Sequence, residues 1–238
     1  MPITLSKTDY ILYRECPKNV WYKIHKPDIY SQSELSDFEK SIMETGNEVE
    51  QIARKLFPTG ILIERRDTKG QRATQDYIKR KQEVLFQPIF AKDGYLAAID
   101  ILKFEPETNS YSIYEVKSTN DIDKKIHYHD LSFQVNLLRK CGLKINKAHL
   151  IHLNSEYVRS GELDITQLFK IVDVSNEVKS VADSVNTEAA EALKYISQIS
   201  EPKGFCCCIY KGRSRHCSTF QYANPQVHRV PSDKLEFY

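Results

Sequence analysis

The feature that most constrains the fold is a run of three β-like segments in the middle of the chain. They read EVLFQPIF (83–90), YLAAIDILKFE (95–105) and SYSIYEVKST (110–119), and all are rich in β-branched, aliphatic and aromatic residues. The links between them, AKDG and PETNS, are typical of hairpin turns. The sequence therefore predicts a meander of strands at the centre of the protein.

Helical patterns come before and after this meander. The N-terminal stretch LSKTDYILYRECPKNVWYKIH predicts a short helix with Ser6 as N-cap, a break at Cys16-Pro17, and a second short helix. Further helices are expected over 33–56, within TQDYIKRKQ (74–82), over 128–141 before Gly142, and as one long polar-faced helix outside the sheet over 174–200, while GILIER (60–65) and KAHLIHLN (147–154) are expected strands. This order predicts a mixed α/β fold class with a central sheet.

Charged residues interrupt two strands of the meander. Asp100 stands within the apolar run AAIDIL, and Glu115 and Lys117 point to one face of the next strand because strand side chains alternate. A hairpin about PETNS would bring Asp100 close to Glu115, and two carboxylates at that distance repel each other unless a cation lies between them. Oxygen ligands in this arrangement suit Mg²⁺ or Mn²⁺, and a lysine beside such a metal can orient a water and stabilise charge on a phosphate.

These residues also have an ordinary structural explanation. A Glu-x-Lys strand is often a solvated face, and an aspartate in a strand can stand at the edge of a turn. The position of Asp100 argues against that explanation, because a carboxylate among so many apolar neighbours is costly when it is buried without a partner.

The order Asp100, Glu115-Val116-Lys117 and then Gln134 on the following helix resembles the PD-(D/E)XK nuclease superfamily. It looks most like the RecB-like exonuclease branch, which includes CRISPR-associated exonucleases and the nuclease module of AddB-type helicase-nucleases. The resemblance covers about residues 5 to 220 and implies a restriction-endonuclease-like core. It also implies that Asp100, Glu115 and the Val116 carbonyl bind the metal, and that Lys117 and Gln134 assist catalysis.

The chain departs from that branch at two positions. The branch has a metal-binding His four residues after a helix Gly, whereas here Gly46 is followed by Glu50, with Glu48 nearby as an alternative ligand. The branch also tends to place a Tyr four residues after its helix Gln, whereas Gln134 is followed by Leu138. These departures leave open a DNA-binding module that has lost catalysis.

Five of the six cysteines fall at the two extremes of the chain. Some members of the branch hold an iron–sulfur cluster with one cysteine before the core and three after it, and the resemblance implies Cys16, Cys206, Cys208 and Cys217 as ligands of a [4Fe-4S] cluster here. Adjacent side chains cannot easily face one site, so the alternating pair Cys206 and Cys208 is favoured and Cys207 is left in excess.

A zinc site is the alternative for these cysteines, with His216 or Cys207 in place of one ligand. A zinc-stabilised interaction domain, in which the Glu-x-Lys pair is incidental, would follow from it. The sixth cysteine, Cys141, is expected to be a buried bystander at a helix end.

Basic and aromatic residues lie between the last two cysteine positions of the predicted cluster. Tyr210, Lys211, Arg213 and Arg215 would form a rim for single-stranded DNA if the cluster fixes their loop, although a solvated loop is the simpler reading for any one of them. The formal net charge of +2 neither demands nor excludes nucleic acid, so any basic surface must be local.

The chain as a whole is expected to be one nuclease domain over 1–238. Its parts would be an Fe–S lobe from 1–30 and 200–220, a core from 33–172, and the helix of 174–200. The N-terminus has no apolar signal segment and no stretch is long enough to span a membrane, which predicts a soluble, cytoplasmic protein.

The predicted function is a Mg²⁺- or Mn²⁺-dependent deoxyribonuclease, acting as an exonuclease on single-stranded DNA or duplex ends. In the resembling family this module commonly stands at the front of a longer protein, so the chain is either a stand-alone version or a piece. The sequence leaves open the cleavage polarity, the oligomeric state, and whether its protein partners belong to repair, CRISPR adaptation or a phage pathway.

Overall fold

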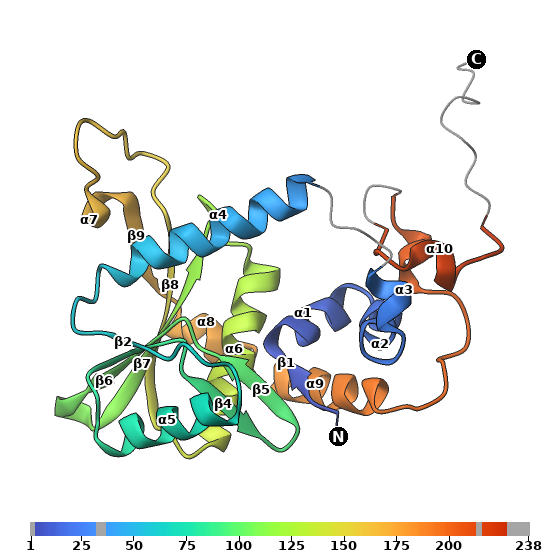
Figure 1. The fold of residues 1–238 in the computed structure, drawn as a ribbon, viewed down its shortest axis with the longest axis horizontal. Coiled ribbons are helices and arrows are strands. Elements are labelled where there is room, and N and C mark those ends of the chain that lie inside the picture. Colours follow the sequence, from blue (N-terminus) through green and yellow to red (C-terminus); the bar gives the residue numbers. More distant parts are fainter. Residues whose placement is uncertain (1–2, 32–36, 213–215, 228–238) are drawn as a thin grey trace.

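A computed structural model describes residues 3–31, 37–212 and 216–227 of this chain (Figure 1). Helices flank mixed β-sheets, so the expected α/β class is confirmed. Residues 33–36 of the predicted helix over 33–56 lie outside the described residues. No helix in the described ranges is both long enough and apolar enough to cross a bilayer.

The central sheet contains six strands among the described residues, in the order β2-β3-β6-β7-β8-β9. The strand β7 pairs antiparallel with β6 and parallel with β8, so the sheet is mixed. A smaller sheet has the order β1-β5-β4. The strands are β1 Leu5–Ser6, β2 Ile61–Leu62, β3 Val84–Phe86, β4 Ile89–Lys92, β5 Tyr95–Ala98, β6 Ile101–Glu105, β7 Ser110–Lys117, β8 Ile145–Leu153 and β9 Phe169–Asp173.

The predicted meander is present, but its first hairpin is bent. Two predicted strands are each divided, into β3 and β4 and into β5 and β6, and the halves belong to different sheets. The bend lies at Gln87, whose φ is +54°, and at Pro88, which has no N–H to donate to a ladder. The two arms stay connected across it, because Gln87 N donates to Asp100 O (3.2 Å) and Ile99 N donates to Pro88 O (3.0 Å).

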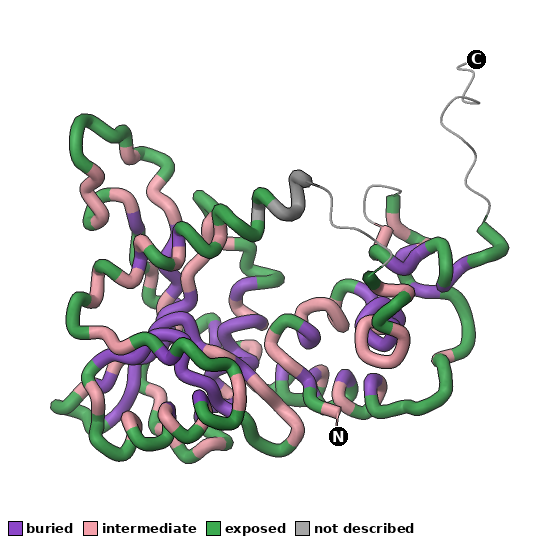
Figure 2. Tube along the Cα trace, in the orientation of Figure 1, coloured by how far each residue is buried: buried purple, intermediate pink, exposed green. Residues whose placement is uncertain are grey.

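Two apolar cores lie on opposite faces of the central sheet, where buried residues concentrate (Figure 2). On one face α6 (Lys124–Lys140) packs against the sheet, with Leu131 and Leu138 in one cluster with Ile113. On the other face α4 (Asp37–Arg54) packs through Val49 and Ala53. The alternation of β7 therefore sends Ile113, Glu115 and Lys117 toward α6. A further helix beside the sheets is α5 (Thr68–Lys79).

The single helix predicted over 174–200 is wrong. The chain forms α8 (Ser175–Ser180) and α9 (Ala182–Ile196), separated at Val181, whose φ of −101° and ψ of 0° are not helical. The second of these helices is not outside the fold. It buries Val185, Ala189, Ala192 and Ile196 against the N-terminal segment and α6.

Segments from the two halves of the sequence pack together in a small helical lobe. The lobe contains α1 (Lys7–Glu15), α2 (Pro17–His25) and the segments 205–212 and 216–224, the second of which contains α10 (Phe220–Ala223) (Figure 1). Asn19 of α2 joins the two ends, since its Oδ1 accepts from Thr219 N (3.3 Å) and Thr219 Oγ1 (2.8 Å). The other described helices are α3 (Pro27–Ser31), α7 (Ile165–Leu168) and the 3₁₀ turns η1 (Pro106–Thr108) and η2 (Cys207–Tyr210).

Candidate active site and candidate thiolate metal centre

The hairpin of β6 and β7 brings two carboxylates together in the interior. Ile101 lies opposite Tyr114, so Asp100 and Glu115 are neighbours where the two strands meet. Their exposed fractions are only 7% and 2%. The predicted approach of Asp100 to Glu115 is confirmed, and their burial removes the explanation of a solvated face.

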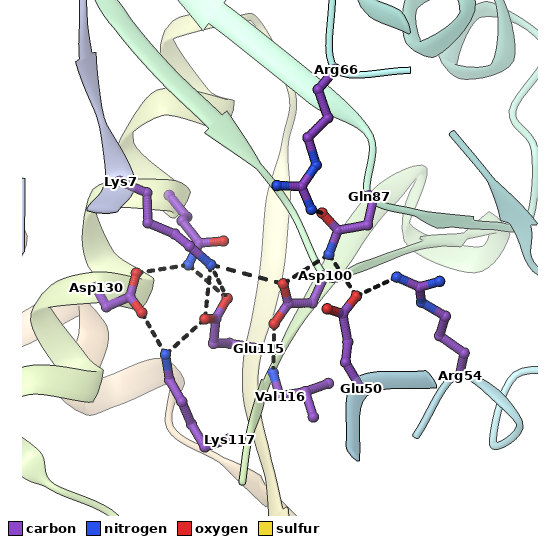
Figure 3. A network of polar contacts seen from close by, with 11 residues as sticks. Lys7, Glu50, Arg54, Arg66, Gln87, Asp100, Glu115, Val116, Lys117 and Asp130 are labelled. Atoms are coloured by element: carbon purple, nitrogen blue, oxygen red, sulfur yellow. Dashed lines mark hydrogen bonds and ion pairs between the residues drawn. The ribbon is translucent and has the colours of Figure 1, made fainter. Parts of the chain in front are cut away.

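Asp100 is satisfied by donors from two directions. Its Oδ2 accepts from Val116 N (2.9 Å), and its Oδ1 accepts from Gln87 Nε2 (3.2 Å) (Figure 3). The same Gln87 Nε2 also donates to Glu50 Oε1 (2.6 Å) from α4. The bend at Gln87 therefore directs its side-chain amide between the carboxylates of Asp100 and Glu50.

Glu50, rather than Glu48, belongs to this cluster. Glu48 is exposed, whereas Glu50 accepts from Gln87 and from Arg54 NH2 (2.6 Å) one helical turn away. The structure thus places the Glu50 carboxylate of α4 near Asp100, with Gln87 bonded to both.

Lys117 and Gln134 meet Glu115 from the α6 side. Lys117 Nζ lies 2.8 Å from Glu115 Oε1, and Gln134 Nε2 donates to Glu115 Oε2 (2.8 Å). Asp130 holds both partners, because its Oδ2 accepts from Lys117 (2.6 Å) and its Oδ1 accepts from Gln134 (3.1 Å). Residues four apart share one face of a helix, so α6 presents Asp130 and Gln134 together.

A second lysine reaches the cluster from the N-terminus. Lys7 is the first residue of α1, and its Nζ lies 2.9 Å and 3.0 Å from the two oxygens of Glu115. It also lies 3.8 Å from Asp100 Oδ1 (Figure 3). Lys7 and Gln87 therefore place one donor group between each neighbouring pair of the three carboxylates Glu50, Asp100 and Glu115.

Burial and the surrounding charges shift the pKa values of the two buried carboxylates, Asp100 and Glu115, in opposite directions. Burial and the nearby Glu115 raise the pKa of Asp100 to about 7, although Lys7 opposes this shift. Burial would also raise the pKa of Glu115, but Lys117 and Lys7 lower it well below its usual range. Burial disfavours the charge of both lysines, yet the surrounding carboxylates raise their pKa values. A divalent cation would therefore be expected to convert Asp100 fully to its ionised form.

The donor set fits a divalent ion that prefers oxygen ligands. Gln87 links the carboxylates of Glu50 and Asp100, Lys7 links those of Asp100 and Glu115, and the Oε1 of the fully buried Gln134 has no hydrogen-bond partner. The sequence analysis named five candidate site residues whose side chains lie in one cluster in the structure: Glu50, Asp100, Glu115, Lys117 and Gln134.

The sequence had missed three members of the cluster, Lys7, Gln87 and Asp130. A signal existed for Asp130, which precedes Gln134 by one helical turn. None existed for Lys7, because its approach depends on the packing of β1 beside β5.

A second cluster lies in the helical lobe. The sulfur atoms of Cys16, Cys206, Cys208 and Cys217 all lie within 4.8 Å of one another, and the first three residues are buried. Cys207 is exposed, and its thiol donates instead to the carbonyl of Glu15 (3.4 Å).

These four thiols suit a metal centre. Hydrogen bonding to Cys217 and burial raise the pKa of Cys16, and burial raises the pKa of Cys208 to about 12. Buried thiols of this kind stay protonated until a metal displaces their protons. Four thiolates are the ligand set of a [4Fe-4S] cluster and also of structural zinc.

One sulfur separation matches that expected around a single tetrahedral ion. Zinc–sulfur bonds of about 2.3 Å place tetrahedral sulfurs about 3.8 Å apart, and the sulfurs of Cys206 and Cys217 are separated by 3.9 Å.

The predicted nucleic-acid rim lies on this lobe and is described in part. The side chain of Tyr210 is 91% exposed, and Lys211 Nζ donates to the carbonyl of Glu15 at the end of α1. Arg213 and Arg215 lie outside the described residues.

Comparisons with solved structures find likenesses to exonucleases. The chain is similar to a phage-related exonuclease from Haemophilus somnus 129PT, with 15% identity over 75% of this chain and 92% of that one and a TM-score of 0.31. It is also similar to the alkaline exonuclease LHK-Exo from Laribacter hongkongensis, with 12% identity over 68% and 84% and a TM-score of 0.28. No protein-family model matches the chain, and no curated protein does. At TM-scores this low neither likeness adds to the reading of the site, which depends on the residues of this chain.

Proposed function

We propose that this protein is a metal-dependent deoxyribonuclease of the PD-(D/E)XK type. One observation carries the proposal: Asp100, Glu115 and Lys117, which appear in that order in the sequence, converge in a buried cluster at a strand hairpin. Burying two carboxylates side by side is costly, and a cation-dependent reaction gives the arrangement a use.

The carboxylates would hold one or two Mg²⁺ or Mn²⁺ ions. Asp100 and Glu115 would supply oxygens from the hairpin, Glu50 would supply one from α4, and the carbonyl of Val116 would supply another. An ion held there supplies Lewis-acid chemistry, since it lowers the pKa of a bound water and neutralises charge on a phosphate.

The remaining residues act on the water and the phosphate. Lys117 is charged, and Glu115 and Asp130 hold its ammonium in place. It would orient the attacking water and stabilise the charge that develops on the phosphate. Gln134 presents a buried amide whose carbonyl oxygen has no protein partner, so it can accept a hydrogen bond from that water.

DNA is the proposed substrate, as single strands or duplex ends. Tyr210 supplies an exposed aromatic face on the lobe, and the basic residues Lys211, Arg213 and Arg215 follow it in the sequence. Bases stack on aromatic side chains without regard to sequence, and basic residues follow the backbone.

The thiolate centre is proposed to be structural, with a [4Fe-4S] cluster as its content. The all-cysteine ligand set and its division between the two chain ends support that content. Zinc is a second candidate, and the separation of the sulfurs favours it. Anaerobic purification with an absorption spectrum and iron, sulfide and zinc analysis distinguishes the two.

Replacing Lys117 tests the proposed reaction. We expect Lys117→Ala to cut labelled DNA about 10³-fold more slowly, because the group that stabilises the phosphate is lost. Binding of Mn²⁺, measured by calorimetry, should remain within about threefold because the carboxylates are retained. The matched control is Lys103→Ala in β6, whose ammonium pairs with Glu105 on the same sheet.

Cleavage by Lys117→Ala at the normal rate would refute the proposal. DNA binding without cleavage in any divalent metal would identify a DNA-binding module instead. A colourless protein with one zinc per chain and neither activity would identify a zinc-stabilised interaction domain.

A further inference from the structure

The N-terminal segment places Lys7 in the carboxylate cluster, and hydrogen bonds hold the backbone on both sides of this residue. Lys7 stands between β1, which pairs with β5, and α1, whose start is fixed by a capping box between Ser6 and Asp9. Leu5 N also donates to Gly94 O (2.8 Å). The backbone on either side of Lys7 is therefore held, and its side chain reaches Glu115 from a fixed origin.

The ammonium of Lys7 lies where a cation between the two strand carboxylates would lie. It bonds both oxygens of Glu115 and approaches Asp100 to 3.8 Å, so it bridges the pair (Figure 3). Without a positive charge there, two nearly buried carboxylates would repel each other across the hairpin.

These contacts also use the oxygens that an ion would need. Lys7 Nζ contacts both oxygens of Glu115, Lys117 contacts one and Gln134 contacts the other. Of the three donors, Lys117 and Gln134 are also bonded to Asp130, whereas the partners described for the ammonium of Lys7 are Glu115 and Asp100. Lys7 is therefore the donor that an ion competing for the Glu115 oxygens would displace most easily.

We propose that Lys7 is a positioning residue that keeps Asp100 and Glu115 together while no divalent ion is bound, and that it releases Glu115 when the ion enters. The inference rests on the proposed function, because it requires a divalent ion at these carboxylates. It makes Lys7 a competitor of the ion, which sets the ion concentration at which the site fills.

Calorimetric titration with Mn²⁺ tests the competition in the full chain with its thiolate centre loaded. We expect Lys7→Gln to bind Mn²⁺ about tenfold more tightly than the parent, because apparent affinity falls with the fraction of molecules in which the site is blocked. Without Mn²⁺ the same variant should melt at a lower temperature, and saturating Mn²⁺ should narrow the difference. Lys23→Gln, which removes an ion pair with Asp9 in the same lobe, is the matched control and should leave Mn²⁺ affinity unchanged.

The parent protein offers a test that needs no substitution. Amine-reactive labelling followed by mass spectrometry should show Lys7 modified several-fold faster when Mn²⁺ is present, with Lys23 unchanged. This measurement decides the matter if Lys7→Gln does not fold.

The outcomes separate the two proposals. Binding of Mn²⁺ by the parent but not by Asp100→Asn would support the metal site. If in that case Lys7→Gln binds Mn²⁺ no more tightly than the parent and Mn²⁺ does not speed the labelling of Lys7, the role of Lys7 is overturned and the metal site stands. If the parent and Asp100→Asn are equally unable to bind Mn²⁺, the proposed function falls and the role of Lys7 falls with it.

Discussion

The carboxylate site and the thiol cluster differ in how their ligands are held. At the carboxylate site, the carboxylates accept hydrogen bonds from the protein, and the donors include Lys7, Gln87 and the backbone amide of Val116. In the lobe, the four sulfurs lie within 4.8 Å of one another, and their outside partners include Asn224 Nδ2, 3.1 Å from Cys206 Sγ, and Thr219 Oγ1, 3.9 Å from Cys217 Sγ. The carboxylates are therefore held by charged and amide donors, whereas the thiols are held mainly by one another.

The backbone beneath each site explains the difference. Glu115 lies in β7 and Asp100 directly precedes β6, its paired strand, in a sheet covered by helices on both faces, so the sheet fixes their positions. Cys206 and Cys208 stand at a four-residue 3₁₀ turn, and Cys16 lies in the break between α1 and α2. Short irregular segments bury little apolar surface and rely on crosslinks for stability.

One helix connects the two sites. Lys7 begins α1 and Cys16 follows its last residue, so the nine residues of this helix, Lys7 to Glu15, form a rod with one end in each cluster. A change at the thiols that displaces α1 would therefore be felt at Lys7 before it reached the sheet.

Removing the metal proposed for the lobe should have the largest effect and should separate the two regions. Structural metal sites contribute on the order of 10 kcal/mol to folding, so chelation should abolish hydrogen-exchange protection in α2 and in 205–224. The strands β6, β7 and β8 should keep theirs. Exchange measured by mass spectrometry before and after chelation checks this, with Cys16→Ser as the genetic equivalent. Equal loss of protection in the sheet would show that the regions are one cooperative unit.

Replacing Asp130 should have an intermediate effect confined to the carboxylate site. Asp130→Asn keeps the shape of the side chain but removes the charge that holds Lys117, so we expect a loss of about 2 kcal/mol in stability. Cleavage should slow about 10- to 100-fold because Lys117 is less well positioned. Mn²⁺ affinity should change little, since Asp130 is not a proposed ligand.

The control for that variant is Asp76→Asn, which removes an exposed aspartate paired with Lys79 on α5. It should leave denaturation midpoints and cleavage rates unchanged. A thiolate centre that lost its metal in Asp130→Asn would contradict the independence of the two regions.

The sequence predicted those parts of the carboxylate site that depend on local rules. Hairpin register and strand alternation are set within about twenty residues, which is why the approach of Asp100 to Glu115 and the shared face of Lys117 could be predicted. Roles taken from family resemblance, such as the carbonyl of Val116 as a ligand, stay predictions.

What the sequence did not reveal depends on packing between distant segments. Lys7 reaches Glu115 across 108 positions through a two-residue strand, too short to give a periodic signal. The bend at Gln87 places a residue other than glycine in the left-handed region of backbone conformation. The break between α8 and α9 at Val181 is not marked by a Gly or Pro in the sequence. Such features follow from the fit between elements.

The smallest effect is expected at Cys207, and it defines the boundary of the thiol cluster. Cys207 is exposed and points to the carbonyl of Glu15, while its neighbour Cys208 is buried among the other sulfurs. Cys207→Ser should therefore keep its full metal content and lie within about 0.5 kcal/mol of the parent in stability. Cys208→Ser, the same chemical change one residue away, should lose metal and lower the melting temperature. Metal analysis and thermal denaturation of the two variants provide the test. Loss of metal from Cys207→Ser but not from Cys208→Ser would mean that Cys207 replaces Cys208 when the metal binds, and that the thiols of the lobe are not prearranged.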